Sequence, residues 1–156
     1  MGNIEVTENW LWLATDSNGH VAAFQTFGSG VLPPALRNNG ELAEMLDTFL
    51  EEGNWRNCRC RVHLEERYKC LEHDANEGSF FNGASELAQS GFFYYVPSHS
   101  ERFAYDRVAS PSKPLTVSEM PLDLQIALRR LKVAAINFAN ATELVESDVS
   151  SINNAI

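Results

Sequence analysis

Two runs of strand-forming residues, Trp10–Thr15 and His20–Phe27, lie on either side of the sequence Asp16-Ser-Asn-Gly19. Aspartate suits the first position of a type I turn, and Gly19 tolerates the left-handed conformation that follows, so this spacing predicts a β-hairpin. Apolar side chains occur on both faces of each predicted strand. Such strands need cover on both sides, and we therefore expect the hairpin to lie inside a sheet that is at least partly covered on both faces.

Two helices are predicted from the spacing of apolar residues. The segment Glu41–Glu52 has the periodicity of a helix that lies on a sheet; Asn38 or Asn39 can cap its start and Gly53 its end. A second helix is expected from about Pro121, because proline is tolerated in a first turn. The apolar stripe of the first helix comprises Leu42, Met45, Leu46, Phe49 and Leu50, and that of the second comprises Leu124, Ala127, Leu128 and Leu131.

Three further strands are predicted. The segment Asn57–Glu65 alternates strictly between apolar or thiol side chains and polar ones, which is typical of a half-exposed strand. Phe92–Val96 and Arg102–Val108 flank a turn and are rich in strand formers. Residues 132–138 fit both helical and strand spacing, so their structure stays open. We expect the polar residues 146–156 to fray.

These elements predict an α+β fold. Its mainly antiparallel sheet is opened by the N-terminal hairpin, with two or three helices packed on it. A length of 156 residues fits a single globular domain over residues 1–156.

The charge composition indicates which kinds of molecule could bind this chain. Twelve basic and 21 acidic residues give a formal net charge of −9, which repels nucleic acid and anionic membranes and favours a protein with a basic surface. The longest apolar run is far shorter than the roughly 20 residues of a membrane helix. The first residues lack the basic and apolar regions of a signal peptide, and three cysteines do not make a disulfide framework. We therefore expect a cytoplasmic location.

A metal site is considered because Cys58, Cys60, Cys70, His63 and His73 lie close together in the sequence. Structural zinc sites usually separate paired cysteines by two to four residues, and on a strand His63 points away from Cys58 and Cys60. Free thiols also behave as small hydrophobic groups. We expect no cofactor, although whether these residues bind a metal stays open.

Five of the 12 basic residues also fall in this middle segment, interleaved with acidic ones. They favour a salt-bridged sheet face over nucleic-acid binding. These residues are Arg56, Arg59, Arg61, Arg67 and Lys69.

Motifs for catalysis are absent from the sequence. Neither Gly-x-Ser-x-Gly nor His-Glu-x-x-His occurs, and Gly28-Ser-Gly30 is not followed by the Gly-Lys-Ser/Thr of a phosphate loop. We expect no catalytic residue.

Three stretches, Trp12–Gly30, Leu87–Tyr95 and Tyr105–Pro111, carry a likeness to known proteins. With Pro114 and Pro121 they resemble a group of uncharacterised small acidic bacterial cytoplasmic proteins. That group is associated with immunity partners of bacterial toxins. The resemblance implies a protein-binding immunity protein that neutralises a toxin in a stoichiometric complex, and it implies no functional residue.

The candidate contact surface for such a partner is an acidic ridge on the first predicted helix, although a solvated helix face has the same pattern. The ridge consists of Glu41, Glu44, Asp47, Glu51 and Glu52. The alternative function is a small ligand-binding or enzymatic domain of unknown substrate, with a pocket lined by aromatic residues that would otherwise fill the core. Those aromatic residues are Trp10, Trp12, Trp55, Phe92 and Tyr94. The oligomeric state stays open.

Overall fold

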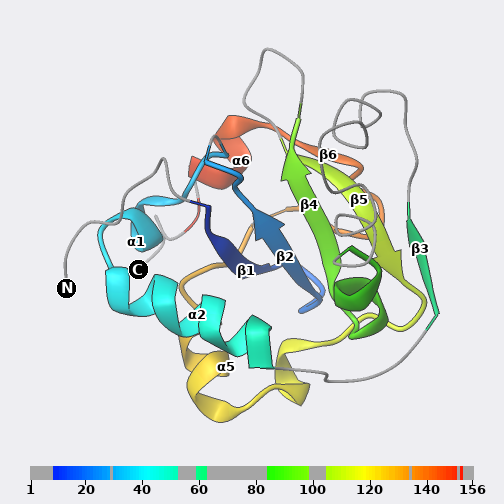
Figure 1. Cartoon of the computed structure of the whole chain (residues 1–156), viewed down its shortest axis with the longest axis horizontal. Helices are drawn as coiled ribbons and strands as arrows, with labels where there is room; N and C mark the ends of the chain where they lie inside the picture. Colours follow the sequence, from blue (N-terminus) through cyan, green and yellow to red (C-terminus); the bar gives the residue numbers. More distant parts are fainter. Residues whose placement is uncertain are drawn as a thin grey trace.

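A mixed β-sheet forms the centre of the computed structural model (Figure 1). The structure describes residues 9–28, 30–52, 59–62, 84–98, 105–133, 135–150 and 152. Its strands are β1 (Leu11–Thr15), β2 (Val21–Gln25), β3 (Cys60–Val62), β4 (Phe93–Pro97), β5 (Tyr105–Pro111) and β6 (Glu143–Leu144). Its helical elements are α1 (Pro34–Arg37), α2 (Gly40–Glu52), a helical segment at residues 84–89, the 3₁₀ turn η2 (Val117–Glu119), α5 (Leu122–Leu128) and α6 (Glu146–Ser150).

The strand order is β1-β2-β4-β5-β3, and β6 also pairs with β5. β2 and β4 are parallel, whereas every other pair is antiparallel. The connection from β2 to β4 contains α1, α2 and β3, as a crossover between parallel strands requires. The predicted α+β class with a mainly antiparallel sheet is confirmed.

The predicted hairpin forms between β1 and β2, with Leu11 opposite Gln25 and Thr15 opposite Val21. The Asp16 carboxylate holds its turn, because Oδ1 accepts hydrogen bonds from the backbone N–H groups of Asn18 at 2.9 Å and His20 at 3.0 Å. Gly19 has φ +79°, a conformation that favours glycine. Both strands are almost wholly buried, as their apolar faces predict.

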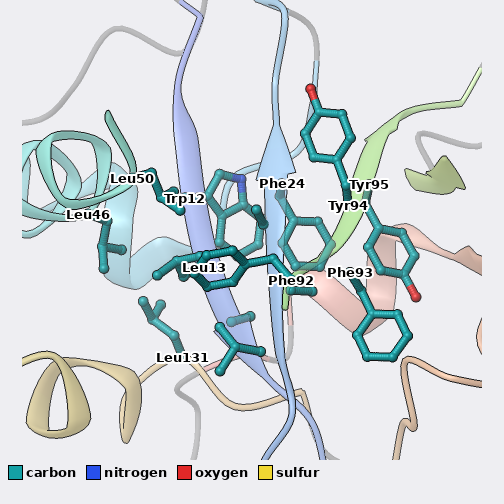
Figure 2. Close-up of a cluster of buried hydrophobic side chains, with 14 of the residues drawn as sticks. Trp12, Leu13, Phe24, Leu46, Leu50, Phe92, Phe93, Tyr94, Tyr95 and Leu131 are labelled. Carbon is teal, nitrogen blue, oxygen red and sulfur yellow. The ribbon is translucent and has the colours of Figure 1, made fainter. Parts of the chain in front are cut away.

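Aromatic side chains stack across three neighbouring strands in the core (Figure 2). Trp12 lies opposite Phe24 in the register, and their rings stack with centroids 4.4 Å apart. Phe24 in turn lies opposite Tyr95, with centroids 5.0 Å apart. Tyr105 meets both Trp12 and Phe24 edge-on. Strand register therefore assembles this part of the core, because paired residues on one face are close neighbours.

Helix α2 begins where the sequence predicts, since Asn39 Oδ1 accepts a hydrogen bond from the Leu42 backbone N–H at 3.2 Å. Leu42, Leu46 and Leu50 are buried, and α2 packs against β1. Figure 2 shows Leu46 and Leu50 pointing toward β1. The predicted Gly53 cap lies outside the described residues.

Helix α5 follows Pro121 and buries Leu124, Ala127 and Leu128 of its predicted stripe; Leu131 is buried too, but it lies beyond the end of the helix at Leu128. Figure 1 shows α2 and α5 at the β1 side of the sheet, away from β3.

Residues 132–138, left open between helix and strand, form neither over their described part. Lys132 makes an isolated bridge to Thr15, and Ala135 has φ +59°. Side chains from distant parts of the chain bind the backbone at the end of this segment. Asp16 Oδ2 accepts the Phe138 N–H at 2.8 Å, and Arg107 Nη1 donates to the carbonyl oxygens of Phe138 and Ala139, each at 2.7 Å. These bonds take the place of a helix or sheet ladder.

The C-terminal residues differ from the expected frayed tail. Residues 146–150 form α6, and Val149 and Ile152 are buried in the core. Val145, Val149 and Ile152 stand at i, i+4 and i+7, which is helical spacing, but this pattern is short and lies among polar residues.

The remaining predicted strands are present with shifted ends. β3 lies within Asn57–Glu65, although the rest of that segment is outside the described residues. Phe92–Val96 corresponds to β4, which has a register shift between Tyr94 and Tyr95. Arg102–Val108 corresponds to β5, which continues to Pro111.

Candidate protein-binding groove

Two of the five predicted acidic ridge residues line a groove between α2 and α5. Glu41 and Glu44 are exposed and form part of its α2 wall, whereas Asp47 is half-buried and lies outside it. Glu51 and Glu52 belong to α2, but their side chains lie outside the described part of the structure. The structure therefore brings Glu41 and Glu44 together, and the rest of the ridge stays a prediction.

The groove has a volume of about 490 Å³. Its lining combines three carboxylates with a mainly apolar floor. The lining residues are Glu41, Glu44, Met45, Thr48, Phe49, Pro121, Asp123 and Leu124.

The packing of the two helices places these side chains. Because α2 buries Leu46 and its stripe toward the sheet, Glu41 and Glu44 remain on the flank that faces α5. On α5, burial of Leu124 leaves Asp123 exposed in the first turn. Asp123 Oδ1 accepts the Leu124 backbone N–H at 2.9 Å, in a position where a carboxylate also interacts favourably with the helix dipole.

The three carboxylates give the groove a negative charge. Within the described residues, neither Glu41 nor Glu44 has an ion-pair or hydrogen-bond partner, so both are available to an incoming group. The half-buried Met45 and Phe49 offer apolar area between them. A lysine or arginine side chain matches this combination, because its aliphatic stem covers apolar surface while its charged head stays at the rim.

A second hollow, of about 380 Å³, lies on the other side of α5 beside the β1–β2 turn. Its walls include Arg129 and Lys132 together with Gln125, Ser17 and the buried Asp16. This hollow could not be predicted from the sequence, because its walls come from two distant segments, residues 15–19 and 117–132. The Asp16 carboxylate is already bonded to three backbone N–H groups, so it belongs to the scaffold.

The aromatic residues named for the alternative pocket lie in or against the core where the structure describes them. Trp12, Phe92 and Tyr94 are buried in the core, and neither of the two hollows includes them. The Tyr94 hydroxyl donates to Gln25 Oε1 at 3.0 Å. Trp10 is half-buried against the core, and Trp55 lies outside the described residues.

Of the residues considered for a metal site, only Cys60 falls in the described part of the chain, where it is half-buried. No group of three His, Cys, Asp or Glu side chains suited to a metal ion occurs within that part. Of the predicted basic sheet face, the structure describes the side chain of Arg59 alone, which is exposed. Both predictions otherwise concern residues outside the described ranges.

Comparison with known proteins adds no family to these observations, since no family model, curated protein or solved structure matches this chain. Among the helices that the structure describes, none has the length and apolar character needed to cross a membrane.

Proposed function

We propose that this chain is an immunity protein, which neutralises a bacterial toxin by forming a stoichiometric complex with a basic surface of that toxin. The observation that carries the proposal is the groove between α2 and α5, where Glu41, Glu44 and Asp123 surround apolar floor residues. The formal net charge of −9 supports it as well. A protein with these properties needs no catalytic site, because binding alone blocks its partner.

Electrostatics favours fast capture in such a mechanism. Complementary charge steers the encounter of two proteins and can raise the association rate constant to about 10⁸–10⁹ M⁻¹s⁻¹ at low salt. Because the Glu41 and Glu44 carboxylates have no partner among the described residues, their charge is available to an incoming basic group.

Titration against the product of the adjacent gene tests the proposal directly. We expect calorimetry to give a tight complex with one copy of each chain, and the partner's toxic activity to disappear at equimolar ratio. If no complex forms at micromolar concentrations, or if a complex forms and the partner remains fully active, the immunity function is wrong.

A further inference from the structure

Two apolar side chains on α5 are exposed next to the groove. Leu122 is 66% exposed and Ile126 is 51% exposed, whereas Leu124, Ala127 and Leu128 of the same helix are buried. Residues four apart on a helix are neighbours on one face, so Leu122 and Ile126 form a continuous apolar ridge. Single exposed apolar residues are common, but here two adjoin a groove whose floor is apolar as well.

The apolar ridge of Leu122 and Ile126 lies on a different face of α5 from the groove, but both include residues at the N-terminal turn of that helix. Leu122 belongs to the ridge, and its neighbours Pro121 and Asp123 line the groove. An incoming segment that lies across this turn would therefore meet an apolar surface and a row of carboxylates side by side. A matching segment must be amphipathic and must carry positive charge next to its apolar residues.

The chemistry of the groove excludes other occupants. Its carboxylates repel phosphate-rich ligands such as nucleic acid and anionic lipid. A hard cation such as Ca²⁺ or Mg²⁺ would gain nothing from Met45 and Phe49, since it binds through oxygen ligands. Arginine and lysine use both parts of the surface, because each has an aliphatic stem and a cationic head.

We infer that the occupant of this groove is an amphipathic segment of the partner protein, which places Arg or Lys between Glu41, Glu44 and Asp123 and covers Leu122 and Ile126 with apolar residues. This inference rests on the proposed function and specifies which part of the partner the protein recognises. The acidic side chains provide steering and orientation, whereas the apolar ridge slows dissociation.

A designed peptide tests the inference without knowledge of the partner. The probe is an end-capped amphipathic helical peptide. Its Leu residues repeat at i, i+4 on one face, and its Arg residues repeat at i, i+4 beside them. One control peptide has Glu in place of Arg, and another has Ser in place of Leu. We expect the Arg/Leu peptide to bind, with NMR shift changes centred on α2 and α5, and both control peptides to bind at least about tenfold more weakly. Shift changes centred elsewhere, or equal binding of the three peptides, would overturn the inference.

Variants of the protein provide the second arm of the experiment. Glu41→Gln with Glu44→Gln, and separately Leu122→Ser with Ile126→Ser, should each weaken peptide binding about tenfold. The matched control is Glu86→Gln with Glu143→Gln, which removes the same charge from exposed residues that do not line the groove and should leave binding within about twofold. All six altered positions are exposed, so unchanged circular dichroism and melting temperature will verify the fold of each variant.

The intact partner separates this inference from the proposed function. One outcome is a tight complex with the partner that is weakened neither by Glu41→Gln with Glu44→Gln nor by Leu122→Ser with Ile126→Ser. In that case the inferred binding site is wrong, while the immunity function stands. If the peptide binds at the groove but the partner does not bind at all, the groove has the inferred specificity and the immunity function is wrong.

Discussion

The Asp16 carboxylate accepts a hydrogen bond from the Phe138 backbone N–H at 2.8 Å, across 122 positions of the sequence. Its other oxygen holds the hairpin turn through Asn18 and His20. One buried side chain thus fixes the turn between the first two strands and joins it to the C-terminal third of the chain. Together with the bonds from the Val133 N–H to the Thr15 carbonyl oxygen and from the Ser17 N–H to the Ile136 carbonyl oxygen, this contact satisfies part of the backbone of residues 132–138 without a helix or a strand.

Replacing Asp16 by Asn should destabilise the protein by about 2 kcal/mol, because an amide has only one acceptor oxygen for three N–H donors and its NH₂ group faces at least one of them. Urea unfolding measures the loss. Asp123→Asn is the control, since that carboxylate is exposed and a change below about 0.5 kcal/mol is expected. Equal losses at the two positions would contradict a structural role for Asp16.

The buried tyrosines predict a loss of stability in alkaline solution. Burial raises the pKa of Tyr94, Tyr95 and Tyr105 above the ordinary value of about 10, because the phenolate loses its hydration. The unfolded chain ionises these groups near pH 10, whereas the folded chain keeps them protonated. Their contribution is therefore fully present below about pH 9 and falls above pH 10, by up to about 1.4 kcal/mol per pH unit for each tyrosine.

Urea unfolding at a series of pH values, together with tyrosinate absorbance, checks this prediction. The absorbance of these three groups should appear with unfolding rather than before it. Tyr94→Phe should make the alkaline loss less steep by about one proton per molecule. A stability that stays constant through pH 11 would show that the three hydroxyls ionise as easily in the folded chain as in the unfolded one.

Gly30 is predicted to be intolerant of a side chain. A Cβ atom there would lie 2.9 Å from Tyr105 Cζ and 3.0 Å from Thr26 Cα, and it would crowd the Tyr105 hydroxyl. That hydroxyl donates to the Val31 carbonyl oxygen at 2.8 Å, so the ring cannot move without losing the bond. We expect Gly30→Ala to cost about 2 kcal/mol.

A double-mutant cycle tests whether Tyr105 is the cause. Tyr105→Phe alone should cost about 1 kcal/mol through the lost hydrogen bond. In the Tyr105→Phe background, Gly30→Ala should cost at least about 0.5 kcal/mol less than in the native chain, because the nearest obstructing atom is gone. Strict additivity would place the strain at Thr26 instead.

Local and distant interactions explain which features the sequence could predict. The hairpin and α2 were predictable because a turn signal at Asp16 and Gly19 and a periodic stripe ending at Leu50 are local patterns. Residues 132–138 were not predictable, because their end is held by Asp16 and Arg107, which are distant in the sequence and bind the backbone of Phe138 and Ala139. The same limit affected the tail, where burial of Ile152 depends on the assembled core.

For the same reason, the sequence could predict the α2 wall of the groove but not its α5 wall. Helical periodicity placed Glu41 and Glu44 together on α2, but Asp123 joins them only because α5 lies beside α2. The sequence predicted burial of Leu124, Ala127 and Leu128, and the structure confirms it. The exposed apolar ridge of Leu122 and Ile126 could not be placed beside the groove from the sequence, because the groove depends on how α5 lies against α2.

The tail provides a further test of the core. Ile152 is fully buried although it follows a polar stretch, so Ile152→Ala should cost about 3 kcal/mol by leaving a cavity. Ser147→Ala, at an exposed position of α6, is the control and should change the stability by less than about 0.5 kcal/mol. Thermal or urea unfolding distinguishes the two, and a cost for Ile152→Ala as small as for the control would mean that the tail is not part of the core.

Salt should separate the steering role of the acidic groove from the apolar contacts. Because the screening length falls from about 10 Å at 0.1 M salt to about 3 Å at 1 M, the association rate constant with a basic partner should fall at least about tenfold over this range. The dissociation rate constant should change far less, since it depends on the buried apolar contact. Stopped-flow mixing measures both.

Neutralising the groove should flatten this salt dependence. Glu41→Gln with Glu44→Gln removes the two charges closest to the incoming cation, so the slope of the logarithm of the association rate against salt should decrease strongly. Glu86→Gln with Glu143→Gln raises the formal net charge equally from −9, yet it should flatten the slope less, because neither residue lines the groove and screening weakens interactions more strongly as the separation grows. If the two pairs flatten the slope equally, only the overall charge steers the partner, and the groove has no special part in the encounter.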